Sequence, residues 1–343
     1  MREQDIRPAD ILATYLDLSR QDALSFFPDP DNLSLGDCPG CAAAGNGTVP
    51  MYSKHGFRVV ECNECQTLFV NPRPAPAQLD AFYRDSPSTE YWANVFFPAV
   101  ADARRDLIFA PRAREVLDLV TQVSGAPDNV VDIGAGYGLF LEELTKLIPS
   151  ARLRAIEPGL ALAKRCREIG LETFEGFAEE AVVQPDWNSQ ADLVTSFEVI
   201  EHLPDPISFV RTMHDLAKPG GLVFFSGLCG DGFDIRILGE KSNAVSPPHH
   251  LTFLSQQGVR ALLVRAGLEC VSFQTPGKLD VDIVRTAFQT DDKLAVDPQI
   301  SALLLDGDEK TRADFQERLV SECRSSHMWV FARRPRSPME ISD

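Results

Sequence analysis

The chain has 343 residues and a formal net charge of −17, from 33 basic and 50 acidic residues. Its length allows one large domain and a smaller one, and its acidic balance is the opposite of the basic footprint that nucleic-acid binders carry. No apolar run approaches the ~20 residues that span a bilayer, and the N-terminus lacks the apolar core of a signal peptide, so we expect a cytoplasmic protein without a membrane span.

The N-terminal segment, residues 1–35, is predicted to be helical in part. Apolar residues recur at roughly helical spacing from Ile11 to Leu24. The run Phe26-Phe27-Pro28-Asp29-Pro30 then ends the pattern, because proline cannot continue a helix.

Four of the eight cysteines form two C-x-x-C pairs, Cys38 with Cys41 and Cys62 with Cys65. Each pair can aim two thiolates at one ion, and four thiolates complete the tetrahedron of a structural zinc without an open position. Two disulfides and unrelated thiols are the alternatives, but a reducing cytoplasm argues against the first and the paired spacing against the second. We therefore predict a zinc ribbon over residues 36–75, with a strand at 57–60 and its partner strand at 67–70.

The next segment, residues 76–125, is predicted to be helical and is rich in aromatic side chains between Phe82 and Phe97. Core packing between two domains and a lid that closes over a ligand are both open interpretations. The segment also contains a dense basic stretch formed by Arg104, Arg105, Arg112 and Arg114. We favour a solvated helix face for this stretch, with a clamp for an anionic group over an active site as the alternative.

From residue 126 to 335 strands and helices alternate, as expected of an α/β, doubly wound parallel sheet. The predicted strands are 130–133, 152–157, 171–174, 192–197, 222–226 and 268–275. The predicted helices are 139–147, 160–169, 206–217 and 255–266. An acidic and then helical insertion, residues 290–324, precedes a last strand that begins at His327, and residues 336–343 form a tail.

The first strand of this region runs into a loop with glycine at every second position, Gly134, Gly136 and Gly138. A strand, a glycine turn and a helix in that order mark the ligand edge of an open α/β sheet, and glycine lets a ligand approach the main chain closely. The spacing is G-x-G-x-G, whereas the dinucleotide fingerprint would require its third glycine at Leu139.

Two acids flank the glycine loop. Asp132 lies two places before the first glycine, and Glu157 ends the next apolar run. A carboxylate at the tip of the second strand can accept hydrogen bonds from a ribose diol. A glycine turn without a ligand and a nicotinamide site are the alternatives.

Together these residues resemble the cofactor site of class I S-adenosylmethionine-dependent methyltransferases. In that family the G-x-G-x-G loop wraps the methionine part of the cofactor, and the acid after the second strand holds the ribose. The amine of the cofactor is then expected to meet Asp132, and its carboxylate the N–H groups at the helix start. The resemblance implies a seven-stranded Rossmann-like sheet with an antiparallel last strand. It assigns cofactor contacts to Asp132, Gly134, Ala135, Gly136, Gly138, Glu157 and Pro158.

Two later segments extend the resemblance. After the third strand, where the family lines the adenine, Phe177 is expected to pack on the ring and the Ala178 N–H to reach it. The family often has aspartate in place of Phe177, and a plain strand-to-loop turn is the alternative. After the fourth strand, similarity to ubiquinone-pathway enzymes implies that Phe197 and Glu198 flank the cofactor and that His202 faces the substrate.

Glu198, Glu201 and His202 stand at i, i+3 and i+4, which is one face of a helical turn. Ubiquinone-pathway and small-RNA 2′-O-methyltransferases resemble the chain in this E-x-x-E-H motif, and there it binds a divalent ion. The resemblance implies a second metal site, with Mg²⁺ as the candidate ion, completed by His249 or His250. The alternative, which we favour, is a capping and hydrogen-bonding role without metal.

Sugar C-methyltransferases with an N-terminal zinc module are similar around His250, which matches the histidine of their Y-x-E-H motif, a proposed base. His249 replaces the glutamate of that motif, and Pro247 its tyrosine. A histidine base suits neutral pH. The candidate catalytic residues are therefore His250, His202 and His249, and a role in capping the helix near Ser255 is the alternative.

The predicted function is methyl transfer from S-adenosylmethionine to a small molecule, such as a sugar, a quinone-like compound or a natural-product intermediate. In such an in-line displacement the enzyme mainly orients nucleophile and methyl group. One alternative is a macromolecule methyltransferase whose zinc module reads RNA or protein, although the charge of −17 disfavours RNA. Another is a cofactor-binding protein without catalysis. No feature of the sequence specifies an oligomeric state.

Overall fold

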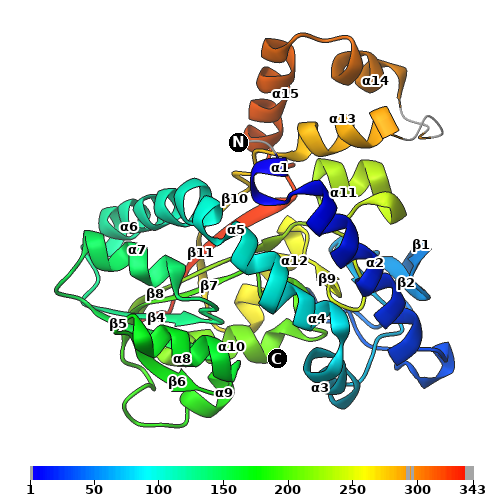
Figure 1. The fold of residues 1–343 in the computed structure, drawn as a ribbon. Coiled ribbons are helices and arrows are strands. Elements are labelled where there is room, and N and C mark those ends of the chain that lie inside the picture. Colours follow the sequence, from blue (N-terminus) through cyan, green and yellow to red (C-terminus); the bar gives the residue numbers. More distant parts are fainter. Residues whose placement is uncertain (1–2, 291–293, 295–296, 337–343) are drawn as a thin grey trace.

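The computed structural model describes residues 3–290, 294 and 297–336. Its centre is a seven-stranded sheet in the order β10-β11-β8-β7-β4-β5-β6 (Figure 1). The strands are β4 (Asn129–Ile133), β5 (Arg152–Glu157), β6 (Glu172–Glu175), β7 (Ala191–Phe197), β8 (Ala217–Leu228), β10 (Glu269–Gln274) and β11 (His327–Arg333). Only β11 runs antiparallel to its neighbours. The predicted α/β class and reversed last strand are confirmed.

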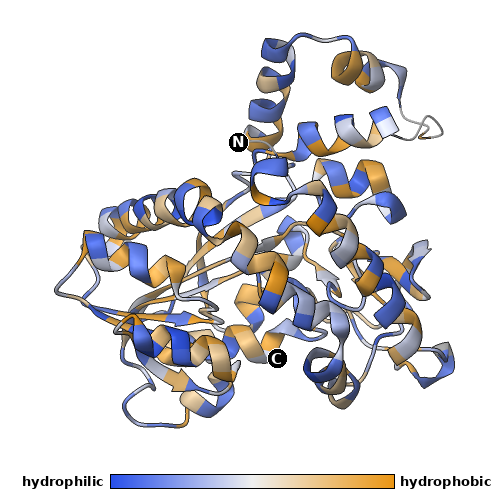
Figure 2. Cartoon of the chain, in the orientation of Figure 1, coloured by the Kyte–Doolittle hydropathy of each residue, from blue (hydrophilic) through white to orange (hydrophobic). Residues whose placement is uncertain are grey.

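Both faces of this sheet are covered by helices, so its central strands β4, β7 and β8 are largely buried. One core contains α9 (Ala178–Ala181), α10 (Pro206–Leu216) and α12 (Gln256–Arg265). The other contains α6 (Ala110–Ser124), α7 (Leu139–Leu147) and α8 (Leu160–Glu168). Figure 2 shows the surface helices striped by hydrophobic and hydrophilic residues, as expected when one face is buried. Neighbouring strand residues point to opposite cores, Val130 to one and Val131 to the other.

A smaller sheet contains β1 (Thr48–Lys54), β2 (Phe57–Cys62), β3 (Leu68–Val70) and β9 (Thr252–Phe253). The strands β2 and β3 were predicted from sequence, but β1 and β9 were not. β1 is mostly exposed and therefore lacks the hydrophobic signal of a buried strand. β9 comes from the large domain, so the ribbon and that domain share one sheet.

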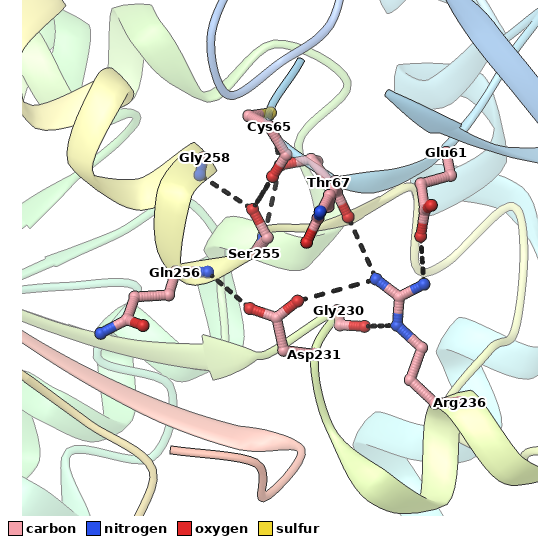
Figure 3. Close-up of polar contacts among 10 residues, drawn as sticks. Glu61, Cys65, Thr67, Gly230, Asp231, Arg236, Ser255, Gln256 and Gly258 are labelled. Carbon is pink, nitrogen blue, oxygen red and sulfur yellow. Dashed lines mark hydrogen bonds and ion pairs between the residues drawn. The ribbon is translucent and has the colours of Figure 1, made fainter. Parts of the chain in front are cut away.

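Polar contacts strengthen this junction (Figure 3). Ser255, which caps α12 by accepting a hydrogen bond from the Gly258 N–H at 2.8 Å, donates its hydroxyl proton to the Cys65 carbonyl. Arg236, in α11 (Phe233–Leu238), pairs with Glu61 and donates to the Gly230 carbonyl at 2.5 Å. The ribbon is therefore built into the fold, while the domain boundaries at residues 35, 75 and 125 stay predictions.

Helices precede and link these sheets, as predicted for residues 76–125. The N-terminal pair is α1 (Glu3–Ile6) and α2 (Ala9–Phe26), and short 3₁₀ turns lie at η1 (Pro30–Asn32), η4 (Ile200–His202) and η5 (Gly239–Lys241). The linking helices are α3 (Pro76–Asp85), α4 (Pro87–Tyr91), α5 (Phe97–Arg104) and α6, with π-helical turns η2 (Trp92–Phe96) and η3 (Arg105–Phe109). Within the described residues no helix is long and apolar enough to cross a membrane.

The insertion before the last strand starts earlier than predicted. It contains α13 (Asp280–Thr290), α14 (Pro298–Leu305) and α15 (Glu309–Ser321), which project from the body of the molecule (Figure 1). Parts of the predicted insertion (291–293 and 295–296) and of the tail (337–343) lie outside the described residues. These helices share a small core with Phe233 and Leu238 of α11, which anchors them to the large domain.

Candidate active site

The glycine loop follows β4 at its carboxyl end. Gly134, Gly136 and Gly138 have φ values of 68°, 57° and 74°, a region that favours glycine. A Cβ atom at Gly134 would lie 2.8 Å from Val199 Cγ2, and one at Gly138 would lie 2.8 Å from Ile169 Cδ1. A Cβ atom at Gly136 would meet nothing within 4 Å. The free side of Gly136 is therefore the place where a ligand can approach the backbone.

The two acids beside this loop are buried. Glu157 accepts hydrogen bonds from the Gly136 and Gly159 N–H groups, both at 2.8 Å, and Asp132 accepts one from Thr195 Oγ1 at 2.7 Å. Burial raises the pKa of Glu157, and it raises the pKa of Asp132 to about 7. A cationic ligand at this place would therefore stabilise the charged form of both carboxylates.

The residues assigned to adenine lie at the neighbouring strand end. Phe177 is 59% exposed and stands just before α9, while Pro158 is exposed in the turn after β5. Ala178 is the first residue of α9, where a helix has N–H groups without intrahelical partners. An exposed ring beside such donors is available to an adenine, and the contacts assigned to Ala135, Pro158, Phe177 and Ala178 stay predictions.

The helical segment before β4 packs on the glycine loop. The Tyr137 ring stacks on Phe97 with the ring centroids 4.4 Å apart and an interplanar angle of 7°. The Tyr137 hydroxyl donates to the Ala93 carbonyl at 2.6 Å. This segment therefore covers one side of the glycine loop.

Glu198 follows β7 with a φ of 56°, which is uncommon for a residue other than glycine. Ser226 Oγ donates to its Oε1 at 2.5 Å, Arg112 Nη2 lies 3.7 Å from Oε1, and His327 Nδ1 lies 3.5 Å from Oε2. Although burial opposes ionisation, His327, Arg112 and Ser226 lower the pKa of Glu198. Because Nε2 of His327 receives N–H groups from Arg112 at 3.2 Å and Trp329 at 3.3 Å, its proton sits on Nδ1, facing Glu198.

A cavity of about 180 Å³ lies beside Glu198. Its walls come from α1, from the α5–α6 segment, from the loop before α13 and from the start of β11. Apolar side chains such as Ile108 and Trp329 alternate with charged ones such as Arg104 and Arg112. The basic stretch of the sequence is thus not simply a solvated helix face, because Arg112 is buried and lines this cavity.

Two of the three candidate histidines lie together with an acid. One ligand atom each from Glu201, His202 and His250 lies within 4.8 Å of the others. His202 Nδ1 lies 2.8 Å from the His249 carbonyl, and His250 Nδ1 lies 2.6 Å from the Ala244 carbonyl. Because a carbonyl oxygen only accepts, each Nδ1 carries the proton and each Nε2 keeps a lone pair.

Burial sets the protonation of this group. It raises the pKa of Glu201 well above its usual value, lowers that of His202, and lowers that of His250 to about 3. Glu201 Oε2 is buried without a hydrogen-bond partner among the described residues. An orphaned carboxyl oxygen beside two imidazole side chains is suited to a divalent ion.

The structure differs from the predicted E-x-x-E-H ligand set. Glu198 turns to Arg112, because its left-handed φ breaks the helical turn that the i, i+3, i+4 spacing assumed. Only Ile200–His202 form a helical turn, η4. His249 also lies apart, since its Nε2 is 3.0 Å from Ser88 Oγ and its ring packs on Phe82 at 4.8 Å between centroids. His249 therefore packs against Phe82 outside this cluster, and its role as a base stays a prediction.

The comparison with known proteins agrees with the strand order and the loop geometry. Residues 105–273 match a family model described as a methyltransferase domain. This part of the chain is a class I S-adenosylmethionine-dependent methyltransferase domain.

Several curated proteins resemble this methyltransferase domain. The ubiquinone biosynthesis O-methyltransferase of Ruegeria pomeroyi is 30% identical over 183 residues, which are 50% of this chain and 63% of the relative. That of Stutzerimonas stutzeri is 40% identical over 114 residues, 30% of this chain and 46% of the relative. The chain thus spans less than two thirds of these relatives. A solved S-adenosylmethionine-dependent methyltransferase of Archaeoglobus fulgidus aligns with 17% identity and a TM-score of 0.47, over 70% of this chain and 100% of its own.

The four paired cysteines converge beside the methyltransferase domain, with their Sγ atoms within 4.8 Å of one another. Cys38 and Cys65 lie 3.5 Å apart and Cys41 and Cys62 3.6 Å apart at sulfur, and all are free thiols. A tetrahedral zinc with Zn–S bonds of ~2.3 Å would hold sulfurs about 3.8 Å apart. The residues that follow the two pairs, Ala42 and Gln66, have nearly equal φ values of 64° and 63°. Two equivalent turns therefore present the thiols, as a zinc ribbon requires.

Two residues of the methyltransferase site had no signal in the sequence. His327 was expected only as the first residue of a strand, and Asp234 was not singled out at all. Both line the cavity, yet each is isolated in sequence from the rest of the site. No local spacing could have found them, because long-range packing alone brings them there.

Proposed function

We propose that the chain is an enzyme that transfers the methyl group of S-adenosylmethionine to a small molecule. The observation that carries this proposal is the small cavity whose wall includes Glu198, at the carboxyl end of the strand next to the glycine loop. Ligands of open α/β sheets bind at this edge. A cavity of about 180 Å³ suits a metabolite better than an RNA or protein chain.

The class of the acceptor atom is proposed from the relatives. The curated proteins that match are O-methyltransferases of ubiquinone biosynthesis, which supports a hydroxyl group on a quinone-like or similar small molecule. The acidic charge of −17 supports the same preference over an RNA acceptor.

The chain's own residues would bind and orient the reactants. S-Adenosylmethionine supplies an electrophilic methyl group on a sulfonium. Glu157 would hold the ribose diol, Asp132 would face the ammonium group, and the free N–H groups at the start of α7 would meet the carboxylate. Glu198, which His327, Arg112 and Ser226 keep ionised, would place a negative charge at the wall of the cavity. With an acceptor in the cavity, these residues would orient its nucleophile toward the methyl group.

A metal ion at Glu201, His202 and His250 also belongs to this proposal. The buried orphaned oxygen of Glu201 and the imidazole lone pairs fit a divalent ion. Mg²⁺ prefers oxygen ligands, whereas imidazole suits transition ions, so the donor set favours a transition ion over the Mg²⁺ that the motif suggested. Such an ion would supply charge that lowers the pKa of an acceptor hydroxyl. Without it, His202 and His250 remain the candidate proton acceptors. The cysteine site is proposed to hold structural zinc.

The proposal is tested with labelled cofactor. Zinc-loaded protein is incubated with methyl-labelled S-adenosylmethionine and cell extract, and the label is followed into small-molecule, RNA and protein fractions. We expect label in a small-molecule product that depends on the enzyme. Label confined to RNA or protein would support the macromolecule alternative, and cofactor binding without any transfer would support the non-catalytic one.

A further inference from the structure

The cavity beside Glu198 contains an arginine that is not fully hydrogen-bonded. Arg104, the last residue of α5, lines the cavity, and its Nε is buried without a hydrogen-bond partner among the described residues. A buried guanidinium edge of this kind is costly unless something binds it.

The other arginines of the cavity are balanced, which singles out Arg104. Arg112 lies 3.7 Å from Glu198, and Arg7 lies 3.4 Å from Glu3. Burial, together with the positive charges of Arg7 and Arg112, lowers the pKa of Arg104 to about 10. The negative charge of Glu198 acts on the Arg104 pKa in the opposite direction. Lys278, in the exposed loop before α13, also lines the cavity.

Arg104 contacts an aromatic ring that packs on the glycine loop. Its guanidinium carbon lies 5.6 Å from the centre of the Phe97 ring, which stacks on Tyr137 of the glycine loop. An anion bound by Arg104 would therefore sit inside the cavity close to the cofactor site.

The same cavity contains an acceptor of hydrogen bonds. Asp234 is 1% exposed, lines the cavity, and its Oδ1 has no partner among the described residues. The neighbouring Asp280 is different, because it receives hydrogen bonds from Ser325 Oγ at 2.6 Å, the Ser326 N–H at 2.7 Å and Gln316 Nε2 at 2.8 Å. The free oxygen of Asp234 suits a hydroxyl or amine hydrogen of a ligand.

We propose that the methyl acceptor is a small acid, whose anionic group binds Arg104 and whose hydroxyl or amine group donates to Asp234. This rests on the proposed methyl transfer, since it names the acceptor class for the same cavity. A carboxylate and a phosphate share the required chemistry, because both accept two parallel hydrogen bonds from a guanidinium.

Binding of defined probes to the full-length, zinc-loaded chain tests the proposal by calorimetry. The probes are 3,4-dihydroxybenzoate, catechol, which lacks only the carboxylate, and inorganic phosphate, each added with saturating S-adenosylhomocysteine. We expect the carboxylate probe to bind at least about tenfold more tightly than catechol, as one charge-assisted hydrogen bond allows. Tighter binding of phosphate than of 3,4-dihydroxybenzoate would identify the anionic group as a phosphate.

Two variants locate the anion. Arg104→Gln should remove the difference between 3,4-dihydroxybenzoate and catechol and leave the affinity for S-adenosylhomocysteine unchanged. Arg114→Gln, an exposed arginine on α6 outside the cavity, should change neither. Equal binding of all probes to the wild type, or anion binding unaffected by Arg104→Gln, would overturn the proposal.

The affinity for S-adenosylhomocysteine distinguishes failure of this inference from failure of the proposed function. If Arg104→Gln weakens S-adenosylhomocysteine as strongly as the acid, Arg104 grips the carboxylate of the cofactor and the inference is wrong. If the wild type fails to bind S-adenosylhomocysteine at all, the proposed function itself fails.

Discussion

At the scale of single residues, glycine geometry divides the candidate cofactor site into structural and ligand-facing positions. Gly134 and Gly138 are needed because a Cβ atom would collide with Val199 or Ile169, but the free side of Gly136 is open. The sequence predicted all three from their spacing alone. It could not separate them, because the separation depends on side chains brought from other elements.

Gly136→Ala should therefore weaken cofactor binding selectively. The new methyl group occupies the side from which a ligand approaches, and the φ of 57° adds strain of about 1 kcal/mol. We expect the affinity for S-adenosylhomocysteine, measured by calorimetry, to fall tenfold or more, which is about 1.4 kcal/mol. Gly56→Ala is the matched control, since Gly56 has a φ of 84° and equally open space in the β1–β2 turn. Equal affinity losses in both variants would reject a ligand at Gly136.

Asp132 predicts a pH dependence of stability. Its folded pKa of about 7 lies above its ordinary value of 3.8 because of burial, so the folded state holds a proton that the unfolded state releases. The resulting stabilisation is complete below pH 3.8 and is lost as the pH rises through 7. Between pH 6 and 8 the unliganded wild type should lose on the order of 1 kcal/mol more unfolding free energy than Asp132→Asn, measured by urea denaturation. Parallel pH profiles of the two proteins would contradict this assignment.

The adjacent histidines show why residue identity alone could not predict which side chains form the site. His249 and His250 have the same chemistry and neighbouring positions, yet one ring packs on Phe82 and the other faces His202 at 4.8 Å between centroids. Sequence spacing does not say to which side a loop residue points. The same problem affected Glu198, whose left-handed backbone removes it from the helical face that the motif implied.

Cobalt binding tests the second metal site without relying on activity. Co²⁺ added to the zinc-loaded protein should give a visible absorption spectrum, because Glu201, His202 and His250 provide a mixed oxygen and nitrogen donor set. His250→Ala should abolish that spectrum. His249→Ala removes a neighbouring imidazole that lies outside the cluster and should preserve it. An unchanged spectrum in His250→Ala would exclude the site.

At the scale of elements, the zinc ribbon is joined to the active site by a shared strand. β9 pairs with β3, the Val70 N–H donates to the Leu251 carbonyl at 2.9 Å, and the Leu251 N–H donates to the Glu201 carbonyl at 2.8 Å. The two C-x-x-C pairs and β2 could be predicted from local sequence. β9 could not, because two residues carry too little pattern and the pairing spans most of the chain.

Loss of zinc should therefore loosen the histidine loop as well as the ribbon. In Cys38→Ser, which removes one of the four thiols, we expect zinc loss and faster amide hydrogen exchange at residues 248–254. Cys270→Ser is the control, since Cys270 is an isolated, half-buried residue of β10. Exchange that increases only within residues 36–75 would show that the ribbon is independent of the site.

At the scale of the whole molecule, the cavity is assembled from parts that are far apart in the chain. Ile6 and Arg7 come from the N-terminal helix region, Arg104 and Arg112 from the middle, and His327 from the last strand. The sequence predicted the strands of the seven-stranded sheet, the glycine loop and the grouping of the four paired cysteines, because each has a local pattern. The acceptor cavity had none, since only the completed fold brings these segments together.

Removal of residues 1–8 should consequently separate acceptor binding from cofactor binding. The truncation deletes Ile6 and Arg7, which form part of the cavity wall. Asp132, Gly136 and Glu157 belong to strands and turns of the seven-stranded sheet, outside the deleted segment. We expect S-adenosylhomocysteine affinity within about twofold of the wild type, and acceptor-dependent turnover reduced by roughly tenfold through a higher KM. Turnover is measured with the small-molecule fraction that supports the wild-type reaction.

A full-rate truncated enzyme would show that α1 is no part of the acceptor site. A truncated enzyme that has also lost the cofactor would show that α1 stabilises the entire domain, and circular dichroism would then reveal the accompanying loss of folded structure.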